Sequence, residues 1–283
     1  MSRIYVHTAL GQVHARVEGT GPALLLLGSA GRSASVFRRL IPLLLDRFTL
    51  IAPDLFGTGS SDPLPAGASI RSIAEAMGQL LDACGSPTAS VYGYHTGNKI
   101  GAALAANWPE RVTGLVLAGQ NHSLIPSNEE RNRVIGGRTK EYFAPPPADA
   151  DERAMRDWET LQKRVTALWW PDGLLAPSGD RAEALQQARA EVLDELTCFD
   201  STPALYKINF AYDLESDLRR IRARTLVLEI ATPDETRHLG PQGQKVCELI
   251  PGSQLRTIQA DGFRLTLEDK AQELAAVLAE FFA

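Results

Sequence analysis

The stretch from residue 91 to residue 103 constrains the fold of this chain more than any other. It reads Val-Tyr-Gly-Tyr-His-Thr-Gly-Asn-Lys-Ile-Gly-Ala-Ala, so strand-forming residues give way to an alanine-rich run within a few positions. β-branched and aromatic residues favour strands, whereas alanine favours helices. Gly93 and Gly97 flank the reversal, and small residues make a sharp turn sterically feasible. The stretch therefore predicts a strand that turns abruptly into a helix, with His95 in a strained backbone at the turn.

Strands and helices alternate on both sides of this turn. The segment 23–27 is apolar at each position, which is typical of a strand buried on both faces of a sheet. We expect a hairpin from residues 3–8 and 12–17, and further strands at 48–53, 114–118, 224–230 and 254–259. Helices are expected at 36–45, 70–84, from His95 to Trp108, at 240–249 and at 266–282. This order predicts an α/β fold with a mostly parallel central sheet and right-handed crossovers.

The alternation stops after Gly119 and returns near Arg222. Helices are expected at 129–142, 150–169 and 182–197, with proline-rich breaks between them. We predict a core built from residues 1–120 and 215–283, and a helical cap formed by residues 121–214. Such an insertion would cover the carboxyl edge of the sheet, where open α/β folds bind ligands. The cap is rich in aromatic residues, most of them expected in its own core and a few on the pocket: Tyr142, Phe143, Trp158, Trp169, Trp170, Phe199, Tyr206, Phe210 and Tyr212.

Composition excludes several classes of protein. The chain has 283 residues, a net charge of −5 and no basic run, so it carries no electrostatic footprint for nucleic acid. Its longest purely apolar run, 23–27, is too short to span a membrane, and its first residues lack the apolar region of a signal peptide. Three widely spaced cysteines argue against a disulfide framework or a zinc site. We expect a cytoplasmic protein without a cofactor, and a homodimer stays open.

With these pieces in order, the chain resembles the α/β-hydrolase superfamily. The resemblance covers roughly residues 12–120 and 215–283 and leaves the cap unmatched. Its markers are the turn at Gly28, the run Ile-Ala-Pro-Asp-Leu-Phe-Gly-Thr-Gly-Ser-Ser-Asp at 51–62, the turn at His95, and Arg-Val-Thr-Gly-Leu-Val-Leu at 111–117. The strand–turn–helix at His95 corresponds to the family's nucleophile elbow, Gly-x-Ser-x-Gly. The resemblance implies the α/β-hydrolase fold, with a helical cap inserted between two core strands.

The chain departs from the family at the positions that carry its chemistry. In the superfamily the elbow residue attacks, a histidine after the last strand acts as base, and an acid after the preceding strand orients it. Here His95 occupies the elbow and Phe263 stands where the base belongs, while Asp234 lies near the position of the acid. The oxyanion turn at Gly28-Ser29 also lacks the family's histidine. A nucleophile without an adjacent base is not activated, so the standard Ser-His-Asp esterase mechanism is excluded.

His95 is the sharpest candidate for chemistry. A histidine on the elbow lies at the pocket floor and titrates near neutral pH, so it can act as a general base. It can also attack an acyl group directly. The backbone N–H groups of Ser29 and Thr96 lie where the family builds its oxyanion hole, next to Gly28 and Tyr94. The alternative is that His95 fills a site that no longer turns over substrate.

Other titratable residues have weaker claims. His122 follows a strand's carboxyl end and is the best placed of them, whereas His238 would need Asp234 to orient it. Glu229 is either a pocket carboxylate or exposed at the sheet edge, and the sequence leaves both open. Asp54 and Asp62 are expected to hold turns through side-chain hydrogen bonds. His7 and His14 are expected to lie on the N-terminal hairpin, far from the site.

Three readings of function follow. The favoured one is a cofactor-free enzyme acting on a small, mostly apolar organic substrate, with His95 as general base and a backbone oxyanion hole. Proton abstraction serves lyase, isomerase and cyclase chemistry, as well as hydrolysis by activated water. The second is a ligand-binding pseudoenzyme, and the third is a hydrolase in which His95 is the nucleophile, assisted by Asp234 or His238.

Overall fold

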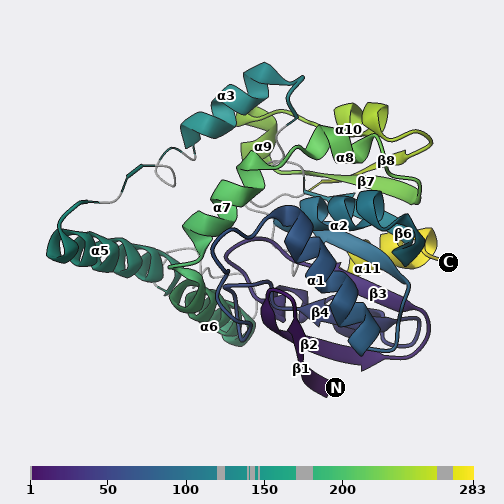
Figure 1. Ribbon diagram of the computed structural model, residues 1–283, viewed down its shortest axis with the longest axis horizontal. Coiled ribbons are helices and arrows are strands. Elements are labelled where there is room, and N and C mark those ends of the chain that lie inside the picture. The colour runs from purple at the N-terminus through teal and green to yellow at the C-terminus, as the bar shows by residue number, and fades with distance from the viewer. Residues whose placement is uncertain are drawn as a thin grey trace.

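The computed structural model describes residues 2–119, 125–138, 140, 144–145, 147–169, 181–259 and 270–283. Its centre is an eight-stranded sheet in the order β1-β2-β4-β3-β5-β6-β7-β8 (Figure 1). From β4 to β8 all neighbouring strands are parallel, and β2 pairs antiparallel with both β1 and β4. The predicted mostly parallel α/β sheet is therefore confirmed. The strands are β1 Ser2–Thr8, β2 Gly11–Gly19, β3 Ala23–Leu27, β4 Thr49–Pro53, β5 Ala89–Tyr94, β6 Val112–Ala118, β7 Arg224–Ala231 and β8 Gln254–Gln259.

Two apolar layers cover the two faces of the sheet. Successive side chains of a strand point to opposite faces, so Leu25 joins one layer while Leu24 and Leu26 join the other. The first layer packs under α1 (Ile70–Ala83), α2 (Thr96–Asn107), α8 (Leu214–Leu218) and α10 (Gly243–Leu249). The second packs under α11 (Ala271–Phe281) and two short 3-10 turns. Both layers exclude water, and this burial is the main stabilisation of the fold.

The two 3-10 turns replace a helix that the sequence predicted. Residues 36–45 were expected to form one α-helix, but the chain forms turns at η1 (Ala34–Phe37) and η2 (Ile41–Leu43). Pro42 explains the difference, because proline removes a backbone donor and its ring clashes with the preceding turn of a helix. The prediction of a single helix there was wrong. Likewise, the expected helix 240–249 starts only at Gly243, after a separate helix α9 (Pro233–His238).

Between β6 and β7, the part of the chain that the structure describes contains helices and no strand. They are α3 (Glu129–Arg138), α5 (Ala150–Trp169), α6 (Arg181–Cys198), α7 (Thr202–Ala211) and α8. The sequence predicted the first three and missed α7 and α8. The boundary between core and cap stays a prediction. None of the described helices is long and apolar enough to cross a membrane.

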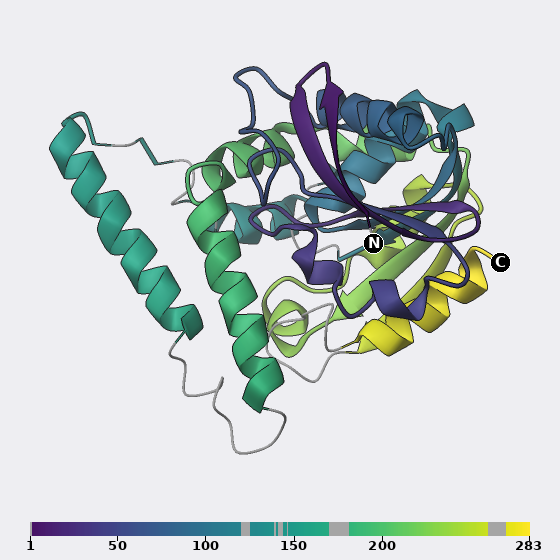
Figure 2. The ribbon, with the colours of Figure 1, turned by 90° about the horizontal axis from the view of Figure 1, so that it is seen from below.

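Helix α5 stands away from the sheet, beside α6 (Figure 2). Its ion pair from Arg164 to Glu195 of α6, at 3.0 Å, lies towards its carboxyl end. Trp158, nearer the amino end, is 61% exposed. Trp158 is therefore not among the aromatic residues that pack in a core, because that half of α5 extends beyond its neighbour.

Candidate functional site

His95 has the backbone geometry that the sequence predicted for the turn. Its φ is 51° and its ψ is −109°, and among the described residues it is the only one other than glycine with positive φ. His95 directly precedes α2, and its N–H donates to the carbonyl of Ala118 at 3.0 Å. Its own carbonyl accepts the N–H of Asn98 at 3.1 Å. The histidine is thus held between the carboxyl ends of β5 and β6 and the start of α2.

The flanking glycines are required by contact distances. A Cβ added at Gly93 would lie 2.4 Å from the carbonyl oxygen of Gly97. A Cβ added at Gly97 would lie 2.1 Å from the oxygen of Leu27 and 2.8 Å from that of Gly28. All three distances are too short for a Cβ atom, so neither position accepts a side chain. The glycines therefore allow α2 to come up against the end of β3.

The imidazole of His95 lies between an aromatic ring and a glycine. It stacks on the ring of Tyr94 with centroids 4.0 Å apart and an interplanar angle of 19°. On another side it lies against Gly119, where an added Cβ would be 2.2 Å from Cδ2 and 2.7 Å from Nε2. His95 is partly exposed, whereas Tyr94 is buried. Tyr94, predicted to border the site, thus contacts the candidate base directly.

The turn at Gly28 and Ser29 lies beside the start of α2, through the close approach of Gly97. Gly28 is buried and Ser29 is partly exposed. Thr96, the first residue of α2, is 2% exposed. The first N–H groups of a helix have no partner within the helix, so they can donate to a ligand. The backbone of this region is therefore able to present donors towards a developing negative charge.

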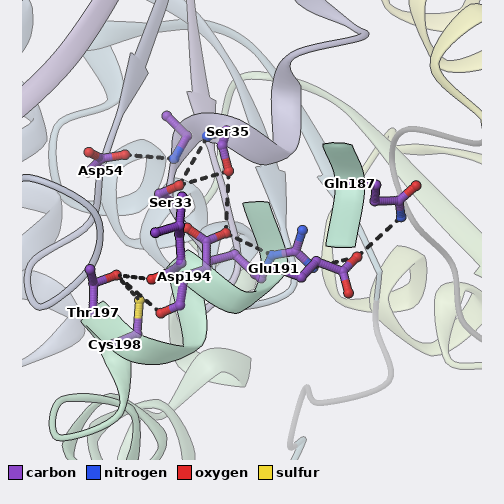
Figure 3. A network of polar contacts seen from close by, with 11 residues as sticks. Ser33, Ser35, Asp54, Gln187, Glu191, Asp194, Thr197 and Cys198 are labelled. Atoms are coloured by element: carbon purple, nitrogen blue, oxygen red, sulfur yellow. Dashed lines mark hydrogen bonds and ion pairs between the residues drawn. The ribbon is translucent and has the colours of Figure 1, made fainter. Parts of the chain in front are cut away.

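Helix α6 docks on the residues that follow this turn through a buried carboxylate (Figure 3). Asp194 accepts a hydrogen bond from Nε of Arg32 at 3.1 Å and one from Oγ of Ser35 at 3.3 Å. Asp194 is 4% exposed. Burial raises the pKa of Asp194, while Ser33 and Arg32 act to lower it. The residues after Ser29 are thus tied to the helices between β6 and β7.

Asp54 holds the turn from the opposite side. It accepts the N–H of Ala34 at 2.7 Å and the N–H of Ser60 at 2.9 Å. It also pairs with Nδ1 of His14 at 2.8 Å, and both side chains are buried. The predicted role of Asp54 in holding turns is confirmed. The sequence missed His14, because nothing in its place on a strand signalled a buried partner. Asp62, likewise, accepts the N–H of Gln12 at 2.7 Å.

Glu229 caps a helix inside the fold. It is 5% exposed and its carboxylate accepts the N–H groups of Gln242 and Gly243 at the start of α10. The alternative that it is exposed at the sheet edge was wrong. Burial raises the pKa of Glu229, and the two backbone hydrogen bonds and Arg131 oppose that rise.

Lys99 is a buried charge that the sequence did not single out. It is 1% exposed, and its Nζ donates to the backbone oxygen of Asn209 at 2.6 Å. Burial, with the charge of Arg131 as a smaller cause, lowers the pKa of Lys99 to about 7. A lysine inside an alanine-rich helix is more often solvated, so the pattern of α2 gave no signal of this burial.

The side chains of the remaining predicted site residues lie outside the part of the chain that the structure describes. His122 and Phe263 lie outside the described residues. Asp234 falls on α9, but its side chain and that of His238 are likewise outside the description. Their proposed roles stay predictions. Among the side chains that are described, no group of three or more His, Cys, Asp or Glu is placed to hold a metal ion.

Comparisons with known proteins add context to this geometry. A family model described as alpha/beta hydrolase fold matches residues 22–157. The chain is 39% identical to an uncharacterized hydrolase of Saccharomyces cerevisiae over 43% of this chain and 41% of that protein. It is 26% identical to a putative carbamate hydrolase of Stutzerimonas stutzeri over 91% of each.

Solved structures share the architecture at lower sequence identity. A hydrolase from Pseudomonas aeruginosa superposes with a TM-score of 0.73 at 23% identity, covering 99% of this chain and 98% of that one. Such a likeness shows a common fold alone. The yeast match spans less than half of the length of that relative. What these proteins do therefore bears on this chain only as support for a proposal.

Proposed function

We propose that this chain is a cofactor-free enzyme with His95 as general base. The chain has the α/β-hydrolase fold, and a family model, hydrolase relatives and structural neighbours support its membership of that superfamily. Its substrate is a small, mostly apolar organic molecule. The reaction is a lyase, isomerase or cyclase reaction, or a hydrolysis that does not use a Ser-His-Asp triad.

The observation that carries this proposal is the backbone of His95. A residue other than glycine in such a conformation costs about 1–3 kcal/mol, and such strain concentrates at functional sites. The strain here presents an imidazole at the carboxyl edge of a parallel sheet, where open α/β folds bind ligands. Imidazole changes its charge near neutral pH, so it is suited to accept a proton there.

The proposed step removes a proton from a carbon next to a carbonyl group. The C–H bond breaks, the proton moves to the imidazole of His95, and the electron pair passes to the carbonyl oxygen as an enolate. The N–H groups of Ser29 and Thr96 donate to that oxygen. The approach of Gly97 to Leu27 and Gly28 supports this role, because it brings the start of α2 up against the turn that contains Ser29. Fixed donors at a developing oxyanion are worth several kcal/mol of barrier.

The test compares turnover and covalent adducts in matched variants. Wild type, His95→Ala and His95→Ser are mixed rapidly with activated esters, lactones and enolisable carbonyl compounds, and the intact mass is then measured. We expect turnover of a carbonyl compound that falls at least about 100-fold in His95→Ala, with no acyl adduct. His7→Ala, which alters an exposed histidine on β1, serves as the control and should be unchanged.

Two outcomes would overturn the proposal in favour of the other readings. A burst that depends on His95, with an acyl mass on that residue, would establish a hydrolase that uses histidine as nucleophile. Stoichiometric ligand binding without turnover of any compound would establish a pseudoenzyme. Turnover that His95→Ala leaves intact would place the chemistry elsewhere.

A further inference from the structure

Three buried polar residues gather under the helices that follow β6. Lys99 comes from α2, Arg131 from α3 and Asn209 from α7, and their exposed fractions are 1%, 4% and 1%. Nζ of Lys99 donates to the backbone oxygen of Asn209 at 2.6 Å and lies 5.4 Å from the ring centroid of Phe210. The charge of Arg131 acts to lower the pKa of both Lys99 and Glu229, so its guanidinium lies near both groups. Two cations from different helices therefore share one buried region.

The side chain of Asn209 is the second feature of this region. Both of its polar atoms, Nδ2 and Oδ1, are buried and make no hydrogen bond within the described part of the chain. A buried amide without partners costs about 1–3 kcal/mol, and such groups call for a ligand or another explanation. Glu229 is not the partner of this amide, because its carboxylate accepts backbone N–H groups at the start of α10.

We propose that Lys99, Arg131 and Asn209 form a subsite that binds the carboxylate of the substrate. The two cations would donate charge-assisted hydrogen bonds, and Nδ2 of Asn209 would add a neutral donor. This inference deepens the proposed function and rests on it, because it takes the bound ligand to be the substrate of His95. It adds one carboxylate to an otherwise apolar molecule.

The position of Lys99 limits the size of that substrate. Lys99 follows His95 by four residues and lies on α2, which His95 directly precedes, so the two side chains start from neighbouring parts of the chain. A compound that reaches both groups is therefore a small organic acid, with its reactive carbon a few bonds from the carboxylate.

The test measures binding without requiring turnover. Wild type is titrated calorimetrically with acetate, butyrate and phenylacetate, and with the matching primary amides, which have nearly the same shape and no charge. The same titrations are made on Lys99→Met and Asn209→Leu. Lys245→Met, a change of a surface lysine that pairs with Glu248, is the matched control. Thermal denaturation of each variant checks that it is folded.

We expect at least one acid to bind wild type at least about tenfold more tightly than its amide. Lys99→Met should lose about tenfold or more of that affinity, Asn209→Leu should lose a smaller factor, and Lys245→Met should lose none. Equal affinity for acid and amide, no binding of any acid, or full affinity in a folded Lys99→Met variant would overturn the inference. In the last case Lys99 serves only to hold α7.

His95→Ala separates this inference from the proposed function. It should bind the acid as wild type does, because the subsite does not include the imidazole. Acid binding with no turnover by wild type would refute the proposed function and leave the subsite in place. Turnover that depends on His95 without any preference for acids would refute the subsite alone.

Discussion

At the scale of single residues, the site is defined by what lies around one imidazole. Tyr94 stacks on the imidazole, and Gly119 leaves room for it. The strained backbone of His95 fixes the point from which the side chain leaves the main chain. The sequence predicted the histidine and the strain, because the flanking glycines are visible in the motif. It could not predict Gly119, since that contact joins the ends of two neighbouring strands, β5 and β6, and depends on how they lie in the sheet.

Gly119→Ala should displace the imidazole. The new Cβ would overlap His95, and the φ of +67° adds about 1–2 kcal/mol of backbone cost. Gly67→Ala is a close control, because Gly67 has a φ of +78° and open space around its Cβ. We expect Gly119→Ala to lose more stability in urea denaturation than Gly67→Ala, because only its Cβ overlaps other atoms, and to lose the His95-dependent activity that Gly67→Ala keeps. Equal activity in both variants would contradict the packing described for His95.

Lys99 should make stability depend on pH. Its pKa is about 7 in the folded protein and 10.5 in the unfolded chain, so between these values the unfolded state binds more protons. The free energy of unfolding should therefore rise as the pH rises from 7 to 10.5, by at most about 1.4 kcal/mol per pH unit. Urea denaturation of wild type and Lys99→Met across this range measures the difference. Parallel profiles for the two proteins would contradict the lowered pKa.

At the scale of elements, the strands could be predicted almost to the residue and the connections could not. β3 matches its prediction because a buried parallel strand reads as a short apolar run, whereas β8, which is mostly exposed, matches because it lies between clear turn signals. The helix expected at 36–45 failed because Pro42 outweighs the helical periodicity. The contact of α6 with the turn after Ser29 was also beyond prediction, because Asp194 and Arg32 are 162 residues apart.

Asp194→Ala should loosen that turn. It removes the acceptor shared by Nε of Arg32 and Oγ of Ser35, and the loss of these partly buried hydrogen bonds should cost about 1–3 kcal/mol, although Arg32 keeps its ion pair with Glu191. Hydrogen–deuterium exchange by mass spectrometry should then be faster across residues 28–35, by about tenfold or more. Glu195→Ala is the control, because Glu195 on the same helix pairs with Arg164 of α5 instead. Unchanged exchange at 28–35 in Asp194→Ala would show that α6 does not hold the turn.

At the scale of the whole molecule, the architecture was predictable, but the way in which the helices after β6 pack was not. Alternating strands and helices imply a parallel sheet between two helical layers, which is the structure observed. Nothing in the pattern of α5 signalled that its amino-terminal half extends away from the sheet with Trp158 exposed (Figure 2). The buried group of Lys99, Arg131 and Asn209 also emerges only when three helices come together.

The measurement that tests the central claim most directly is exchange of substrate protons with solvent. Small enolisable acids and ketones are incubated with the protein in D₂O, and the loss of the proton next to the carbonyl is followed by NMR. We predict that wild type and His7→Ala catalyse this exchange and that His95→Ala does not. The rate should increase with pH over the range in which a histidine loses its proton. Exchange at the same rate in His95→Ala would contradict the claim that His95 is the base.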